Sequence, residues 1–299
     1  MNMKATVRRR ELGTELRKVR ESTGMTLNEL ARNVGWDPSK LSRIEHGKLP
    51  CTEIEAAILL GYCRVAGNRL DEVVALCSGD VDGTWLRQNG GIPDQLRTLV
   101  MHEACASAIY ALELNRIDGL LQTEDYAREL MRGAGLVPEH GIPPRVRARL
   151  ERQTLLRRAD PPSFVFYMHE QVLHLPVGSD QIMHEQMLHL LFLADRPRCV
   201  IRILPTEAGP HAGLGGPFRV MQYVDQQSVV CLETQNRSLF LESSVDIATY
   251  WLILAKLAEV ALTAQESRSV LAAAVSRYDR VGVRDHGDPD GLAQEQLQR

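Results

Sequence analysis

The sequence lacks the features of a secreted or a membrane protein. No apolar run approaches the roughly 20 residues that a helix needs to cross a bilayer. The basic start, MNMKATVRRRELG, has no apolar segment behind it and does not resemble a secretory signal. Six cysteines lie far apart, without a CxxC pair: Cys51, Cys63, Cys77, Cys105, Cys199 and Cys231. This spacing favours reduced, mostly buried thiols over a disulfide framework or a zinc site, so we expect a cytoplasmic protein.

The charge distribution is uneven along the chain. The composition, 44% hydrophobic and 24% charged, is that of a folded protein, and 299 residues suffice for two domains. The net charge is −3, yet the first 50 residues hold 11 Lys/Arg and 6 Asp/Glu, against 24 and 32 in the remainder. A basic front end on an acidic body favours contact with a polyanion through its phosphates. A solvated basic arm would have the same composition.

Three helices with clear boundary signals are predicted near the N-terminus. The first covers Arg9–Ser22. Thr26 and Glu29 form a capping box that starts the second. Asp37 as N-cap and Pro38 in the first turn start the third, which runs to Glu45.

The third helix has a polar outer face. Leu41 and Ile44 are three residues apart and are expected to face inward. The side chains left outside are Ser39, Lys40, Ser42 and Arg43. Hydroxyl and cationic donors on a short helix suit contacts with base edges and phosphates. An ordinary helical bundle with a polar surface is the alternative.

The segment GMTLNELARNVG, followed by SKLSRIEHGK, resembles the Cro/C1-type helix-turn-helix of the xenobiotic-response-element family. The matching positions are Leu30, Ala31, Gly35, Ser42, Ile44, Glu45 and Gly47. The resemblance implies DNA contacts by Thr26, Ser39, Lys40, Ser42 and Arg43 and a phosphate contact by Lys48. Asn28, where family members often carry other polar residues, is included with them. Glu45 is expected to hold the turn rather than to contact a base.

The remaining elements predict an α+β domain. Helices over Thr52–Val65 and Arg69–Cys77 complete the N-terminal bundle. Further on, we expect helices over 96–114, 124–132, 145–158, 245–264 and 266–276, strands over 163–168 and 199–204, and a hairpin of 218–223 with 228–232. The fold class is therefore an all-α N-terminal helix-turn-helix bundle followed by an α+β C-terminal domain. The domains are residues 1–79, a linker at 80–84, a sensor, partner or dimerisation domain at 85–279, and a disordered tail at 280–299.

Several segments imitate enzyme motifs. His169–His174 and His184–His189 suggest the zinc-binding HExxH pattern, but their histidines are five apart and diverge by roughly 140° on a helix. The glycine-rich segment 209–216 lacks the Lys-Ser/Thr pair of a phosphate-binding loop. No serine stands in a G-x-S-x-G context, and the cysteines are more simply read as buried apolar residues. We expect no metal, no cofactor and no enzymatic activity.

The C-terminal half resembles a large actinobacterial regulator family. The segment IDGLLQTEDYAR (117–128) carries the resemblance, although Asp118 stands where the family usually has proline. The other matching positions are RLERQ (149–153), Glu170, ILP (203–205), GPH (209–211) and Phe218. Members are described as antitoxin-like transcriptional regulators, often encoded beside a small partner protein. That role is what the resemblance implies.

The main hypothesis is a dimeric, sequence-specific transcriptional regulator. Its C-terminal domain would sense a small molecule or bind a small protein partner. Residues proposed for that contact are Gln122, Tyr126, Arg149, Gln153, Glu170 and His211. The alternative is that they are core and helix-capping residues whose hydrogen bonds are all made within the fold. One alternative is a DNA-tethered enzyme, which requires Glu170, His211 and a Cys or Arg to converge. Another is a pure interaction module whose partner controls release of DNA.

Overall fold

The computed structural model describes residues 6–77, 84–88, 97–234 and 237–285. These residues form two compact units. The first unit takes Met1–Ala106 and Val220–Tyr250, and the second takes Ser107–Arg219 and Trp251–Arg299. The predicted linker at 80–84 lies outside the described residues, apart from Thr84.

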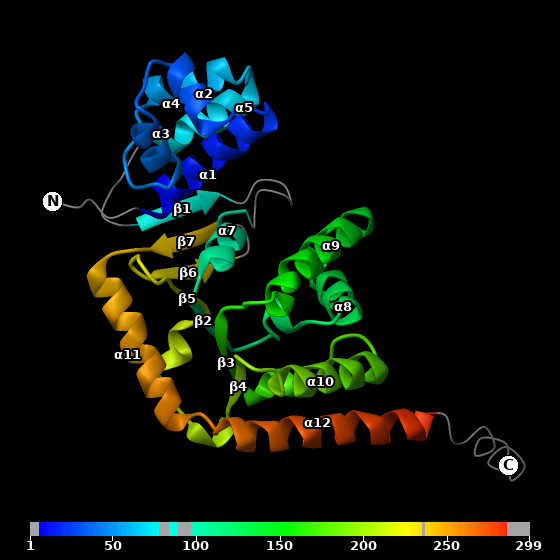
Figure 1. The fold of residues 1–299 in the computed structure, drawn as a ribbon. Helices are drawn as coiled ribbons and strands as arrows, with labels where there is room; N and C mark the ends of the chain where they lie inside the picture. Colours follow the sequence, from blue (N-terminus) through cyan, green and yellow to red (C-terminus); the bar gives the residue numbers. More distant parts are fainter. Residues whose placement is uncertain (1–5, 78–83, 89–96, 235–236, 286–299) are drawn as a thin grey trace, which may run out of the picture. The chain divides into compact units, whose positions relative to one another are not determined.

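A bundle of five short helices begins the first unit (Figure 1). They are α1 (Val7–Ser22), α2 (Leu27–Asn33), α3 (Pro38–Glu45), α4 (Glu53–Tyr62) and α5 (Asn68–Val74), with a 3-10 turn, η1 (Ala75–Cys77), after α5. The bundle closes over a core of apolar residues: Leu12, Leu16, Val19, Leu30, Ala31, Leu41, Ile44, Ala56, Leu59, Leu60, Val73 and Leu76. The predicted helices are confirmed, with ends that differ by a few residues.

Local capping explains where α2 and α3 begin. Thr26 accepts from the backbone N–H of Glu29, whose carboxylate accepts from the backbone N–H of Thr26, so the capping box is complete. Asp37 accepts from the backbone N–H of Ser39 at 2.7 Å, and Pro38 occupies the first turn. Both predicted starts are therefore confirmed.

α1 and α3 approach so closely that a glycine is required between them. A Cβ on Gly13 would lie 2.5 Å from the carbonyl oxygen of Ile44 and 2.6 Å from that of Glu45. Both are backbone atoms, so relief needs a shift of one helix against the other. Gly47, just after α3, has φ +68°, and its Cβ would meet the backbone nitrogen of Arg10 at 2.9 Å. The end of α3 is thus pressed against α1.

Gly13→Ala should destabilise the bundle by about 1–3 kcal/mol, because the added methyl overpacks this contact. The matched control is Gly61→Ala on α4, where a Cβ meets nothing within 4 Å. That change should stabilise by about 0.5–1 kcal/mol, since alanine is the better helix former. Thermal unfolding of both variants measures the contrast. Equal effects would show that α1 and α3 are less tightly packed than described.

The rest of the first unit contains β-structure. β1 (Thr84–Gln88) pairs antiparallel with β7 (Arg237–Leu241), which pairs antiparallel with β6 (Val229–Glu233). β6 is also the neighbour of β5 (Phe218–Gln222), which confirms the predicted hairpin. β1 and β7 were not predicted from the sequence.

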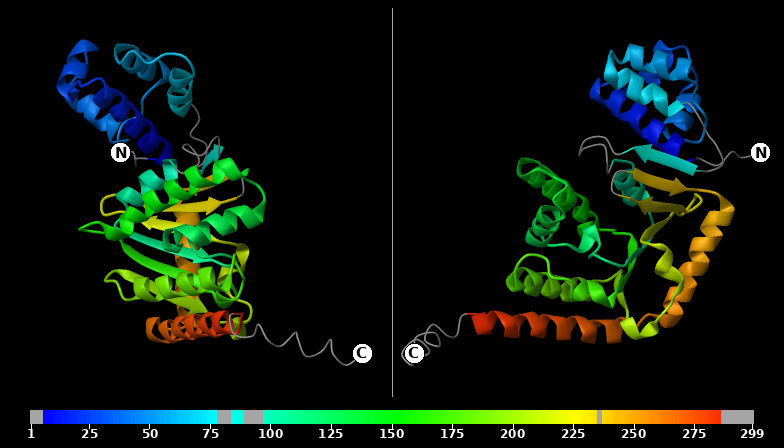
Figure 2. Two further views of the ribbon diagram at one scale, coloured as in Figure 1. Left: turned by 90° about the vertical axis from the view of Figure 1, so that its right-hand side faces the viewer. Right: turned by 180° about the vertical axis from the view of Figure 1, so that it is seen from behind.

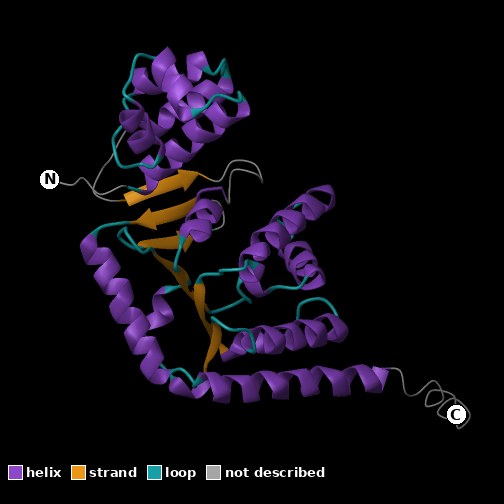
Figure 3. Cartoon of the chain, in the orientation of Figure 1, coloured by secondary structure: helices purple, strands orange, loops and turns teal. Residues whose placement is uncertain are grey.

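The expected helix over 96–114 is wrong in its second half. Helix α7 (Arg97–Cys105) ends before this point, and Ala108–Glu113 forms strand β2 (Figure 3). Five of the six β2 residues are buried, so the strand lacks the apolar–polar alternation that identifies a half-exposed strand. Pairing with β3 (Ser163–His169) decided its conformation.

Parallel strands and long helices build the second unit. β2 pairs with β3, and β3 pairs with β4 (Cys199–Leu204), both in parallel. The helices are α8 (Glu124–Ala134), α9 (Ile142–Gln153), α10 (Asp180–Ala194) and α12 (Ala264–Asp285), and α11 (Ser244–Val260) begins in the first unit. Helices α10 and α12 lie side by side (Figure 2). Mixed strand pairing with helices confirms the α+β prediction.

Two further expectations need correction or completion. The tail predicted to be disordered from 280 is helical to Asp285, because α12 continues past its predicted end; residues 286–299 lie outside the described part. α10, which includes His184 and His189, was not predicted as an element.

Among the described residues, no single helix is long and apolar enough to cross a membrane. The pair α11 and α12 reaches the required length and composition only when the two helices are taken together, and they are bent by 69° relative to each other.

Candidate nucleic-acid interface

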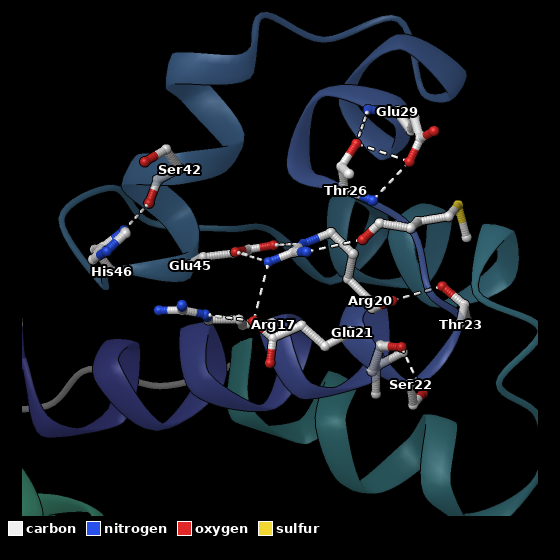
Figure 4. Close-up of polar contacts among 12 residues, drawn as sticks. Arg17, Arg20, Glu21, Ser22, Thr23, Thr26, Glu29, Ser42, Glu45 and His46 are labelled. Carbon is white, nitrogen blue, oxygen red and sulfur yellow. Dashed lines mark hydrogen bonds and ion pairs between the residues drawn. The ribbon is translucent and has the colours of Figure 1, made fainter.

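A buried ion pair fixes the end of α3 against α1 (Figure 4). The Nε and Nη2 atoms of Arg20 donate to the two carboxylate oxygens of Glu45 at 2.7 and 2.9 Å. The third contact, from Arg20 Nη1 to the carbonyl of Met25 at 2.9 Å, reaches the turn before α2. Hydrogen bonding to Glu45 raises the pKa of Arg20 above its ordinary value, although burial opposes this. The structural role expected for Glu45 is confirmed.

This clamp leaves one face of α3 outward. Ser39 and Arg43 are exposed and Ser42 is half-buried. Within the described parts of the chain, no hydrogen bond or ion pair engages the Arg43 guanidinium. A free guanidinium on a rigid helix can form the bidentate contacts that recognise guanine or phosphate. Arg43 is therefore the best placed cation of the predicted set.

Lys40 is held more closely than the sequence suggested. Its ammonium lies 2.6 Å from a carboxylate oxygen of Glu55 and 4.0 Å from the centre of the Trp36 ring. Glu55 also completes the capping box of α4 with Thr52. Burial is the largest single effect on the pKa of Glu55 and raises it, but the hydrogen bonds from Lys40 and Thr52 and the charge of Lys40 together outweigh burial and lower the pKa. A DNA contact by Lys40 would require the ammonium to leave or to share this pair.

The other predicted contacts lie at the ends of α2 and α3. Thr26 is exposed, and its hydroxyl bonds to the Glu29 carboxylate at 2.8 Å. Asn28 and Lys48 are exposed. Since α2 starts at Leu27, Thr26 and Asn28 lie where backbone N–H groups attract phosphate. The Glu29 carboxylate opposes that attraction, and its pKa is lowered by the backbone hydrogen bond from Thr26.

Sequence reasoning missed two residues near this face. Trp36, in the turn between α2 and α3, lies against Lys40 and orients it. His46 is exposed directly after α3, and its Nδ1 lies 2.7 Å from the carbonyl of Ser42 (Figure 4). In the sequence, a tryptophan in the turn between two helices and a histidine directly after the last helical residue could have indicated that these two residues lie near the outer face of α3.

Three of the C-terminal residues belong to one hydrogen-bond network in the second unit. Gln122 donates to the carbonyl of Ile117 at 2.7 Å and accepts from Arg149 at 2.5 Å. Gln153 donates to the carbonyls of Gly119 and Gln122 at 2.9 and 2.8 Å. Both glutamines are buried, and Arg149 is half-buried. These contacts hold the turn at 117–122, which favours the interpretation as satisfied core groups over a ligand contact.

The remaining three are not bonded to that network. Tyr126 is fully buried, and burial raises the pKa of its hydroxyl to about 12. Glu170 accepts from the backbone N–H of Thr206 at 2.9 Å. His211 accepts at Nδ1 from Gly213 at 3.1 Å, and its ring stacks on His169 at 6.2 Å between centroids. Burial and then the neighbouring imidazole lower the pKa of His211.

The thiol of Cys199 is not activated. Burial raises the pKa of the Cys199 thiol to about 12, so it is a poor nucleophile at neutral pH. No group of three or more His, Cys, Asp or Glu side chains suited to a metal occurs among the described residues. His169 ends β3 and His174 follows the turn after it, whereas His184 and His189 lie on α10, so the two similar motifs have different conformations.

Two family models match the chain. One, described as a helix-turn-helix domain, matches residues 11–73, which include α1 to α4 apart from the first turn of α1. The other, described as a domain of unknown function (DUF5753), matches residues 96–273, more than half of the chain. No curated protein matches the chain. The first match indicates a DNA-binding regulator rather than an enzyme.

Proposed function

The chain belongs to the family described as a domain of unknown function (DUF5753), and on that premise we propose that it is a sequence-specific transcriptional regulator. Its helix-turn-helix domain, of the Cro/C1 type, binds double-stranded DNA, and two chains act as a homodimer on paired half-sites. The protein works in the cytoplasm, without a cofactor.

One observation carries the proposal. Arg43 extends freely from a helix whose end is clamped by the buried Arg20–Glu45 pair. The clamp fixes the backbone that carries Arg43, and the planar guanidinium matches the two acceptors on the major-groove edge of guanine, so the contact discriminates between bases. Ser39 and Ser42 on the same helix supply hydroxyl contacts, and Thr26, Asn28 and Lys48 supply phosphate contacts. Lys40 joins them when it exchanges Glu55 for a phosphate.

The first experiment identifies the DNA sequence. The full-length protein is incubated with a pool of random duplexes, and bound duplexes are amplified and sequenced. The proposal expects enrichment of a defined sequence. Recovery of the unselected pool, with no enrichment, would contradict sequence-specific binding.

Arg43→Ala is expected to cost about 1–3 kcal/mol of binding to the selected duplex and to relax the base preference at one position. Affinities for the selected duplex and for its single-base variants measure both effects. The control, Arg17→Ala, removes an exposed arginine from α1 that is paired with Glu21. Uniform weakening on every duplex by Arg43→Ala would mean that Arg43 contacts phosphate only.

We propose that the C-terminal domain regulates this binding, in the manner of antitoxin-like regulators. It would respond to a small ligand or to a small protein encoded by an adjacent gene. Of the three proposed residues outside the Gln122 network, Tyr126 is fully buried, whereas Glu170 and His211 lie on the loops that follow β3 and β4. Genome-wide mapping of bound DNA, with and without the adjacent-gene product, tests the partner: an unchanged map would favour a ligand.

A further inference from the structure

Two cysteines from distant parts of the sequence meet in the helix-turn-helix bundle. Cys51 lies in the loop between α3 and α4, directly before Thr52, which caps α4. Cys77 is the last residue of η1, the 3-10 turn that follows α5. Both are free thiols, and their side chains are hydrogen-bonded to each other. We call these two residues the thiol pair.

The two thiols differ in their access to solvent. Cys51 is only 6% exposed and belongs to the core of the bundle. Cys77 is half-buried and packs against that core. A small oxidant can therefore reach the sulfur atom of Cys77 from solvent, while the sulfur atom of Cys51 is held in contact with it from the core.

The hydrogen bond also makes the two thiols differ in acidity. It is the largest effect on the pKa of Cys77 and lowers it, although burial opposes this. The same hydrogen bond, followed by burial, raises the pKa of Cys51. When the thiol pair loses one proton, the negative charge is therefore on Cys77, and the thiol of Cys51 donates to it. Since the thiolate is the nucleophilic form of cysteine, Cys77 is the reactive member of the pair.

Two other cysteines show what burial does without such a partner thiol. Cys63 belongs to the same bundle and is also 6% exposed, and burial raises its pKa. Burial raises the pKa of Cys199, in the second unit, to about 12. The lowered pKa of Cys77 therefore comes from its contact with Cys51 and not from its position in a folded core.

We propose that the thiol pair is a site of reversible oxidation, at which a hydroperoxide converts Cys51 and Cys77 to an intramolecular disulfide. The two side chains are already in contact, and a disulfide requires that their sulfur atoms approach to about 2.05 Å. An accessible thiol that meets the oxidant, next to a second thiol that resolves the product, is the arrangement of redox-sensing cysteines. The inference goes beyond the proposed function and does not depend on it.

The oxidation proceeds in two balanced steps. The Cys77 thiolate attacks the terminal oxygen of the hydroperoxide, and an S–O bond forms as the O–O bond breaks. The leaving alkoxide or hydroxide takes up the proton that Cys77 released. The sulfur of Cys51 then attacks the sulfenic sulfur of Cys77, the S–O bond breaks, and the leaving hydroxide departs as water with the proton of Cys51. The two thiols together lose two electrons and two protons, and the hydroperoxide is reduced.

The disulfide joins two parts of the bundle that the sequence separates. It links the loop after α3 to the turn after α5, and so closes a loop that contains α4 and α5. A bond of this kind restricts the unfolded chain and stabilises the bundle. Thiol reductants reopen it by exchange, so the modification is reversible.

Thiol counting tests the site in the full-length chain. Cys105→Ser removes the exposed thiol that could link two chains, and it leaves five of the six cysteines. An equimolar amount of hydrogen peroxide should remove two of the thiols that are titrated after denaturation, and dithiothreitol should restore them. If all five thiols persist, the proposal is overturned.

Tryptic digestion of the same oxidised protein locates the bond. Trypsin cleaves after lysine and arginine, and it releases residues 49–64 with Cys51 and residues 70–87 with Cys77. The two peptides should be joined after oxidation and separate after reduction. Cys63 is in the first peptide, so Cys63→Ala is the matched control and should give the same joined peptides. Loss of the joined peptides in this control would assign the bond to Cys63 and reject the thiol pair.

Two serine variants test which thiol reacts first. In Cys51→Ser the hydroxyl can still donate to Cys77 but cannot form a disulfide, so the sulfenic acid should persist on Cys77 and be trapped by dimedone. In Cys77→Ser, Cys51 should remain a thiol under the same treatment. Dimedone on Cys51 in Cys77→Ser, with none on Cys77 in Cys51→Ser, would overturn the assigned order of attack.

The peptide map decides the site independently of the serine variants and of DNA binding. Circular dichroism melts establish that each serine variant is folded. The joined peptides are measured without substitution of Cys51 or Cys77, so they test the bond even if a serine variant does not fold. Failure to bind DNA would not change the map, and absence of the bond would not affect the proposed DNA binding.

Discussion

Arg20→Ala is expected to destabilise the helix-turn-helix bundle by about 3–5 kcal/mol, because it leaves the Glu45 carboxylate buried without its partner. The two side chains are only 9% and 2% exposed, so water cannot replace the lost hydrogen bonds. The contact from Arg20 to the carbonyl of Met25 is lost as well. Urea or thermal unfolding of the full chain measures the change.

Two further variants show that the effect comes from the buried charge. Arg17→Ala removes an arginine whose pair with Glu21 is half exposed, and it should cost at most about 1 kcal/mol. Replacing both partners, Arg20→Met with Glu45→Leu, should recover much of the stability, because no charge is then left buried. If the double variant loses as much unfolding free energy as Arg20→Ala does, the stabilisation comes from the packing of these two side chains and not from their charges.

The Arg20–Glu45 pair also predicts a loss of DNA binding. Removal of the clamp frees the end of α3 from α1, and Arg43 is on that end. At temperatures where Arg20→Ala is still folded, the affinity for the selected duplex should fall although no contacting residue has changed. Normal affinity in the folded variant would mean that the other contacts of α3 position Arg43.

Asp118→Ala is expected to have the second large effect, about 3–5 kcal/mol, in the second unit. Asp118 pairs with Arg219 at 2.5 Å, and their side chains are 1% and 5% exposed. Asp118 also accepts from the backbone N–H of Leu120 at 2.8 Å, which starts the turn before α8. Burial is the largest single effect and opposes ionisation, but the charges of Arg219, Arg152 and Arg116 and the hydrogen bond from Leu120 together lower the pKa of Asp118.

The lowered pKa gives the pH dependence of this effect. A carboxyl group whose pKa is lower in the folded state stabilises the fold above its unfolded pKa of about 4, and this stability is lost as the pH falls through the folded value. Asp118→Asn keeps the turn contact but loses the charge, so its unfolding free energy should depend less on acid pH. An identical pH dependence in wild type and Asp118→Asn would contradict the assignment. The family that the C-terminal half resembles usually has proline at this position. The pair with Arg219 explains how an aspartate can be buried there.

Short-range chemistry made the N-terminal helices predictable. Thr26 with Glu29, and Asp37 with Pro38, are each close in the sequence, and their caps form without help from the rest of the chain. The inward Leu41 and Ile44 and the outward Arg43 also follow from helical spacing alone.

Long-range pairing made other elements unpredictable. Ala108–Glu113 has the composition of a buried helix and of a buried strand, and hydrogen bonds to β3, more than 50 residues later in the sequence, selected the strand. β7 was not predicted from the sequence, and antiparallel pairing with β1 and β6 defines it.

The sequence by itself determined the helix boundaries of the N-terminal bundle, the α+β class and the list of polar residues that face outward from α3. The tertiary structure alone decided which of those side chains are free. Lys40 meets Glu55 across 15 residues, Arg20 meets Glu45 across 25, and Asp118 meets Arg219 across 101. The physical reason is that an ionic or hydrogen-bonding group acts on whatever lies within about 3 Å of it, and only the folded chain brings distant residues that close.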